Sequence, residues 1–354
     1  MKRLIIKILA VIVLIGFVIY LFYAPRLEFD VLENPNQSSN RPLKKAEPHL
    51  NVEENPKLKD GLGLLIGKNM TSVSDKLGQA DRVYQALENN KTYVYHRKDL
   101  YVLVTAQQDK VKSIYMTGTN TKEESGPIQV GDDASTLYNK YTINTEPEFQ
   151  FEGKYYHFEL SDRDVKTQAL IQFDNIFAQV FIDQQSNEIT GIRYLDKEAL
   201  ITINPYSQNE DHTEDTQNTK EIYSPEQNAN QLLTLYELTN EMRQRYQREP
   251  LKVNATLENV ATVNLFHSID GSSTEFTESS LIDLVNQTSL SYQSISQNVG
   301  YNFNDVPTLV NSWINSDVHR SRMLSSKYSE MGGQIDRDYY LLIFVERGED
   351  QNGV

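Results

Sequence analysis

The feature that most constrains this chain is an apolar run close to its N-terminus. Every residue from 8 to 23 is apolar, glycine or tyrosine, and residues 4–6 extend the run with one interruption, Lys7. About 20 residues of α-helix rise about 30 Å, which matches the hydrocarbon core of a bilayer. We therefore predict a transmembrane helix over residues 1–24.

The charges around this run predict its orientation. Lys2, Arg3 and Lys7 precede or interrupt it and no acidic residue does, so the positive-inside rule places the N-terminus in the cytoplasm. The alternative is a cleaved signal peptide, which requires small residues before the cleavage site. Phe22 and Ala24, followed by a proline, make a poor site. We favour an uncleaved signal-anchor, with the rest of the chain extracellular at the cell membrane.

Composition excludes several classes of protein. The net charge of −15 and the pI near 4.9 argue against nucleic-acid binding, which needs a basic face. A mean hydropathy of −0.54 argues against a protein with several spans. The absence of cysteine excludes disulfides and thiolate metal sites, so stability must come from packed cores.

Two polar stretches divide the remainder of the chain. Residues 25–60 are rich in Asn, Pro, Lys and Glu and predict a disordered stalk. Residues 205–226 are acidic and poor in apolar side chains, which predicts a linker. Globular blocks are expected over residues 61–204 and 227–348.

The first block has the pattern of an internal duplication. A short amphipathic segment begins at Ile66-Gly67 and is followed by alternating apolar runs, and Val130-Gly131 begins a second copy of this order. A helix followed by antiparallel strands in each copy predicts an α+β domain. His96 and His157 have no partner at ligand spacing, so we expect packing or surface roles for both.

The second block begins and ends with clear secondary-structure signals. Residues 231–245 and 306–314 have helical apolar periodicity, the latter with a stripe that includes Leu309 and Trp313. Residues 339–346 and 328–335 predict strands, and Gly332-Gly333 predicts a close backbone approach.

Three segments of this block resemble one known family. They read LYELTNEMRQRYQREPLKVNATLENVA, SQNVGY and VNSWINSDVHRSRMLSSKYSEMGGQI. Their order and residues resemble the CAP superfamily of cysteine-rich secretory, antigen 5 and pathogenesis-related-1 proteins, also called SCP-like, over residues 227–348. The first block resembles the CAP-associated domain that precedes such domains in Gram-positive bacteria.

The resemblance implies a CAP α-β-α sandwich whose central cavity holds two His and two acidic residues that can bind a divalent metal such as zinc. His319 and Glu330 match one His and one acid of that set. Gln297 stands where the family has Glu, and a neutral amide is a poor metal ligand and cannot act as a general base. His267 is the candidate for the other His, although counting back from Gln297 without gaps reaches Ser273 instead.

Several alternatives follow for this cavity. His267 is either a shifted ligand or an ordinary helix residue. His319 and Glu330 form either a structural pair, an exposed cavity pair, or the core of a metal site. Because a metal site needs at least three good ligands and the sequence supplies two, zinc is a possible cofactor and no other is expected.

For function, the anchor, the stalk and the incomplete cavity favour a binding or scaffolding module at the cell envelope. Its partner would be another envelope protein, a cell-wall polymer or a lipid. The acidic charge disfavours anionic wall polymers unless a basic patch such as Arg243, Arg245, Arg248 and Lys252 contacts them. No catalytic residue is assigned, and the alternative is a metal-dependent hydrolase that uses His319, Glu330 and His267.

Overall fold

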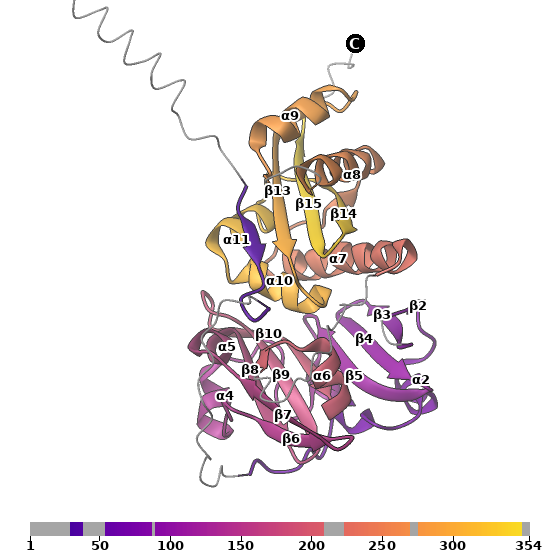
Figure 1. Ribbon diagram of the computed structural model, residues 1–354, viewed down its shortest axis with the longest axis vertical. Coiled ribbons are helices and arrows are strands. Elements are labelled where there is room, and N and C mark those ends of the chain that lie inside the picture. Colours follow the sequence, from indigo (N-terminus) through magenta and orange to yellow (C-terminus); the bar gives the residue numbers. More distant parts are fainter. Residues whose placement is uncertain (1–28, 38–53, 87–88, 209–222, 270–274, 349–354) are drawn as a thin grey trace, which may run out of the picture.

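The computed structural model describes residues 29–37, 54–86, 89–208, 223–269 and 275–348, which form two folded parts (Figure 1). The predicted transmembrane helix at residues 1–24 lies outside these ranges. Within them, no helix has the length and apolar character needed to cross a bilayer.

The first part is built on an antiparallel sheet of seven strands in the order β2-β3-β4-β5-β10-β9-β8. The strands are β2 (Arg82–Gln85), β3 (Lys91–Arg97), β4 (Leu100–Gln107), β5 (Lys110–Thr117), β8 (Gln168–Phe173), β9 (Ile176–Asp183) and β10 (Glu188–Leu195). Two three-stranded meanders, β3–β5 and β8–β10, meet where β5 pairs antiparallel with β10.

Matching hydrogen bonds at the start of each half agree with the duplication predicted from the sequence. The N–H of Gly67 donates to the carbonyl of Val111, and the N–H of Gly131 donates in the same way to Ile189. Both glycines have positive φ, 77° and 99°, a conformation that glycine adopts without strain. Each half therefore begins with the same turn against its own last strand.

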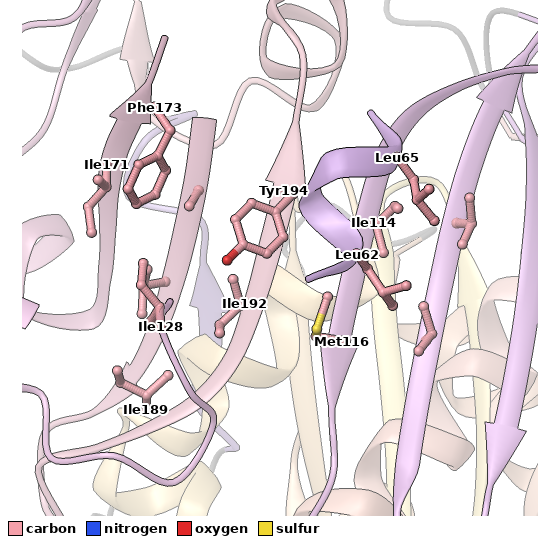
Figure 2. Close-up of a cluster of buried hydrophobic side chains, with 14 of the residues drawn as sticks. Leu62, Leu65, Ile114, Met116, Ile128, Ile171, Phe173, Ile189, Ile192 and Tyr194 are labelled. Atoms are coloured by element: carbon pink, nitrogen blue, oxygen red, sulfur yellow. The ribbon is translucent and has the colours of Figure 1, made fainter. Parts of the chain in front are cut away.

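One face of this sheet carries the main core of the first part. Alternate strand residues such as Ile114, Ile171 and Ile192 point to one face, as the period of two requires. They pack with Leu62 and Leu65 of the short helix η1, as Figure 2 shows. The covering helices are η1 (Leu62–Leu65), α2 (Met70–Leu77), α3 (Lys122–Ser125) and α4 (Ser135–Lys140).

The second face of the sheet is divided between two neighbours. A smaller sheet in the order β11-β7-β6 and two helices surround a separate cluster that includes Phe158 and Phe177. These elements are β6 (Glu148–Phe151), β7 (Lys154–Glu159), α5 (Asp162–Thr167), α6 (Lys197–Ile203) and β11 (Ser207–Gln208). Strand β11 falls inside the predicted linker of residues 205–226, whose residues 209–222 are outside the described residues.

The second folded part has three layers. Its five-stranded sheet has the order β1-β13-β15-β14-β12, with strands β1 (Val31–Glu33), β12 (Lys252–Val253), β13 (Tyr292–Tyr301), β14 (Glu330–Asp336) and β15 (Tyr339–Arg347). Leu341 and Ile343 pack under α8 (Ala255–Ile269) and α9 (Glu278–Asn286). Leu342 and Phe344 point the other way, toward α7 (Pro225–Arg245), α10 (Val306–Ile314) and α11 (Asp317–Met323).

Strand β1 differs from the predicted disordered stalk of residues 25–60. Residues Val31–Glu33 pair in parallel with Val299–Tyr301 of β13 and form one edge of the second sheet. Composition could not predict this contact, because the partner strand lies more than 260 residues further along the chain. We call residues 29–37 the N-terminal strap.

The two folded parts share one hydrophobic cluster. Helices α7 and α10 lie between the two sheets (Figure 1), and Trp313 and Leu235 join Tyr115 and Phe181 of the first sheet in this cluster. Side-chain ion pairs also cross the interface. They are Arg82–Glu237, His96–Glu241, Arg193–Asp305, Arg245–Glu188 and Arg320–Asp183.

Candidate functional site

His319 lies on α11 and is buried, with 2% of its surface exposed. Its Nε2 is 3.1 Å from the carbonyl oxygen of Asp30 in the N-terminal strap, and its Nδ1 is 2.9 Å from the hydroxyl of Ser316. Because a carbonyl only accepts, Nε2 carries the proton and Nδ1 accepts from Ser316. Burial lowers the pKa of His319, partly offset by the Asp30 hydrogen bond, so the neutral ring is favoured.

Gln297 lies on β13 on the α8 side of the sheet and is fully buried. Its Oε1 accepts a 2.7 Å hydrogen bond from Nδ2 of Asn264 on α8. Its backbone carbonyl accepts from Arg322 of α11, whose guanidinium lies 4.9 Å over the ring of Phe29. Among the described residues, Nε2 of Gln297 and Oδ1 of Asn264 have no hydrogen-bond partner.

Asn298 follows Gln297 and points to the opposite face of the sheet. Its Nδ2 donates to the backbone carbonyl of His319 at 2.9 Å, which joins β13 to α11. The ring of His319 in turn lies parallel to Trp313, at a centroid distance of 6.3 Å and an interplanar angle of 4°. These contacts fix the orientation of His319.

Glu330 is engaged elsewhere. Its carboxylate accepts from Nδ2 of Asn254 at 2.5 Å and lies 3.4 Å from Nε of Arg347. It begins β14, which β15 separates from β13, and it shares a face with Gly332, against which Leu257 of α8 packs. The predicted pair of His319 and Glu330 is therefore not formed: His319 of α11 bonds to Ser316 and Asp30, whereas Glu330 of β14 bonds to Asn254 and Arg347 on the α8 side of the sheet.

His267 lies near the C-terminal end of α8 with its side chain exposed. It follows Phe266, which is 55% exposed, and the two rings lie 6.2 Å apart. The neighbouring Asn264, one turn earlier, faces the sheet and meets Gln297. The side chain of His267 is thus directed away from the residues around His319.

This donor set does not fit a divalent metal. Both ring nitrogens of His319 are committed to hydrogen bonds, Glu330 is held by Arg347, and Gln297 is neutral. Over the ranges listed above for the described chain, no three His, Cys, Asp or Glu side chains are grouped closely enough to hold one ion. A zinc site at these residues would require His319 to turn and Glu330 to change partners.

Comparison with known proteins identifies both folded parts. Residues 66–206 match the model of the CAP-associated N-terminal family, and residues 236–345 match that of the cysteine-rich secretory protein family. A crystal structure of a cysteine-rich secretory protein from Staphylococcus aureus is 45% identical. It matches with a TM-score of 0.81, covering 91% of this chain and 100% of that one. The chain belongs to the cysteine-rich secretory protein family.

Two more distant proteins also match most of this chain. An extracellular protein with an SCP domain from Bacillus anthracis has 22% identity and a TM-score of 0.71, covering 86% of this chain and all of that chain, so it shows the fold alone. The uncharacterized membrane protein YlbC of Bacillus subtilis is 24% identical over 328 residues, which are 88% of this chain and 92% of that protein.

In this CAP domain, the residue after His319 is used for domain docking. Arg320 forms a 2.9 Å ion pair with the fully buried Asp183 of the CAP-associated domain and lies 4.7 Å over the ring of Tyr246. The hydroxyl of Tyr246 also donates to Asp183 at 2.6 Å. Arg320 was not singled out from the sequence, and its partner Asp183 lies in the other domain.

Of the four basic residues considered from the sequence, Arg248 and Lys252 are exposed, whereas Arg243 and Arg245 are engaged within the protein. Arg243 is 1% exposed and donates to backbone carbonyls, including those of Met323 and Glu249. Arg245 pairs with Glu188 across the domain interface. These two arginines therefore hold the CAP domain together and fix it to its neighbour.

Proposed function

We propose that this chain is a membrane-anchored extracellular CAP protein that serves as a binding or scaffolding module at the cell envelope. The observation that carries the proposal is the state of His319. Its two ring nitrogens are satisfied by Ser316 and by the N-terminal strap, so it supports structure and leaves no free lone pair for a metal or a proton transfer.

The fixed arrangement of the two domains supports a scaffolding role. Five ion pairs and a shared hydrophobic cluster join them, and Asp183 is buried between Arg320 and Tyr246. An interface of this kind presents two domains in one orientation, which a module that positions a partner requires.

The anchor is supported by the sequence of residues 1–24 and by two relatives. One of them is named a membrane protein, and the other is an extracellular protein with an SCP domain. We extend both properties to this chain. The partner class that we favour is an envelope protein, because the net charge of −15 opposes binding to anionic polymers; a wall polymer or a lipid is the alternative.

Fractionation tests the anchor. The full chain is compared in a Gram-positive host with a variant lacking residues 1–24, fused to a secretion signal that is removed. We expect the full chain in the carbonate-resistant membrane fraction, accessible to protease added outside the cell, and the variant in the medium. A full chain in the soluble fraction would contradict the anchor.

A zinc titration separates the module from the metal-dependent hydrolase. We expect calorimetry of the full chain in detergent to show no binding with a dissociation constant below about 10 μM. Tighter binding that is lost in His319→Ala, and kept in the matched control His267→Ala, would favour the hydrolase instead.

A further inference from the structure

The N-terminal strap attaches to the CAP domain, although the CAP domain comes last in the sequence. The N–H of Phe29 donates to the carbonyl of Phe276 at 2.6 Å, and Val31 pairs with Val299. Residues 25–28 alone separate Phe29 from the predicted transmembrane helix of residues 1–24. The five steps from residue 24 to residue 29 span at most about 18 Å. The CAP domain, and not the domain that comes first in the chain, is therefore held close to the predicted membrane helix.

The direction of β1 determines which end of the CAP domain is close to that helix. Strands β1 and β13 are parallel, so the chain enters β1 from the side on which β13 starts. Arg322 donates to the carbonyl of Gln297 and lies over the ring of Phe29, which places Phe29 level with Gln297. Tyr292, the first residue of β13, lies five residues before Gln297, about 17 Å along the strand. The reach of residues 25–28 is thus about equal to the distance from Phe29 to this end of the sheet.

Helix α9 and the residues that follow it form this end of the domain. The hydroxyl of Tyr292 donates to Oδ1 of Asn286 in α9 at 3.1 Å, which holds the helix against the start of β13. In Figure 1, α9 lies at one end of the molecule, and strands β6 and β7 of the CAP-associated domain lie near the other. The strap runs between the two domains and reaches the CAP-associated domain where Asn36 donates to Asp164. We call residues 278–291 the α9 end.

The α9 end is polar and carries no positive charge. Its charged residues are Glu278 and Asp283, and its exposed side chains are mostly hydroxyls and amides, which are those of Ser279, Asn286, Gln287, Ser289 and Ser291. Two negative charges repel anionic lipids, so electrostatic attraction does not bring this end to a bilayer. Its position near the membrane therefore depends on the length of the connection through residues 25–28.

We propose that the α9 end of the CAP domain faces the lipid head groups and that the CAP-associated domain is the outermost part of the molecule, which reverses the order of the two domains in the sequence. This inference rests on the proposed membrane anchor and adds to the proposed function the orientation in which the domains are presented. The interface that includes Arg320 and Asp183 transmits this orientation from the CAP domain to its neighbour. An envelope partner then meets the CAP-associated domain first.

The orientation is tested with the full chain in phosphatidylcholine vesicles whose head groups carry a nitroxide quencher. Since the chain has no cysteine, Ser289→Cys introduces a single thiol at the α9 end, and Lys154→Cys introduces a matched exposed thiol on β7. Each thiol is labelled with the same small fluorophore, and flotation isolates the chains that are bound to vesicles. We expect the nitroxide to quench the fluorophore at 289 and to leave the fluorophore at 154 as bright as in vesicles without quencher.

Two insertions test whether the short connection sets the distance. A flexible Gly/Ser linker of about 20 residues has a root-mean-square length of about 25 Å. Inserted between Ala24 and Pro25, it should abolish most of the quenching at 289, because it lengthens the chain before the strap. The same linker between Ala46 and Glu47, which lie after the strap, is the control and should leave the quenching at 289 unchanged.

The outcomes separate this inference from the proposed anchor. A chain that floats with the vesicles and is quenched equally at 289 and 154 would lie along the membrane, which would overturn the orientation and leave the anchor standing. Quenching at 154 alone would place the CAP-associated domain next to the lipid and overturn it as well. A chain that does not float would overturn the anchor and the orientation together.

Discussion

At the scale of single residues, the domain interface depends on charges that are removed from water. Arg193 is 2% exposed and reaches from β10 to Asp305, which also accepts from the N–H of Thr308 and so caps α10. A buried charge without its partner is costly, because its hydration is lost and nothing replaces it. Removing only one member of the pair should therefore lower the stability of the protein strongly.

We expect Asp305→Ala to lower the free energy of unfolding by about 3 kcal/mol or more, since it isolates Arg193 and removes a helix cap. Asp305→Asn keeps a capping oxygen and should be milder by about 1 kcal/mol. The control is Lys57→Ala, which breaks the exposed pair with Asp174 and should cost less than about 1 kcal/mol. Denaturant titration measures all three, and equal effects of Asp305→Ala and Lys57→Ala would contradict the argument.

A histidine at the same interface gives a pH dependence. His96 lies 2.9 Å from the buried carboxylate of Glu241, and the hydrogen bond to Glu241 raises the pKa of His96 against the opposing effect of burial. A raised folded-state pKa stabilises the protein fully below the unfolded pKa, about 6.5, and the gain is lost as pH rises through the folded value. We expect the difference in unfolding free energy between the unaltered chain and His96→Gln to be larger at pH 6 than at pH 8. A difference that grows with pH would contradict this sign.

The candidate site was predictable in its residue types but not in its geometry. The motif around Trp313 identified His319, and the substitution of Gln297 for an acid was visible in the sequence. The partners of these residues could not be predicted from the sequence. Asp30 lies almost 290 residues before His319, and strand β15 separates β13 from Glu330. Asn264 could have been recognised, because it is a polar residue at one of the buried positions of α8.

At the scale of elements, β14 shows what a local pattern can predict. The pair Gly332-Gly333 predicted a close backbone approach, and this is confirmed, because a Cβ atom on Gly332 would lie 2.6 Å from the backbone nitrogen of Glu258 in α8. The strap is the opposite case, since the three residues of β1 have too little pattern of their own and acquire their structure from β13.

The close approach of α8 to β14 leads to a direct prediction. Gly332→Ala should force the helix away from the sheet and lower the free energy of unfolding by about 1–3 kcal/mol. The control Gly348→Ala meets the hydroxyl of Ser291, a short side chain that can rotate, and should have a smaller effect. Thermal denaturation compares the two, and a neutral Gly332→Ala would show that α8 moves without cost.

At the scale of the whole molecule, the sequence predicted two folded blocks but not the contacts that join them. Low hydrophobicity in residues 205–226 suggested an independent linker, yet Tyr206 is fully buried and donates to the carbonyl of Gln168. The strap adds a further connection, because Asn36 donates to both Asp164 and the carbonyl of Pro205 in the CAP-associated domain. Such contacts combine residues from distant parts of the chain, and no local pattern encodes them.

The shared cluster implies that the two domains unfold together. Phe181 of β9 is 1% exposed, packs edge-on against Tyr115 and belongs to the same cluster as Trp313 of α10. We expect calorimetry of the chain to show one transition. Phe181→Asp places a charge in this cluster and leaves the separate cores around Ile114 and Ile343 intact, so it should split the transition into two. Val263→Asp, at a position 41% exposed on α8, is the control and should leave a single transition. Two transitions in the unaltered chain would show that the two domains unfold separately and would contradict this expectation.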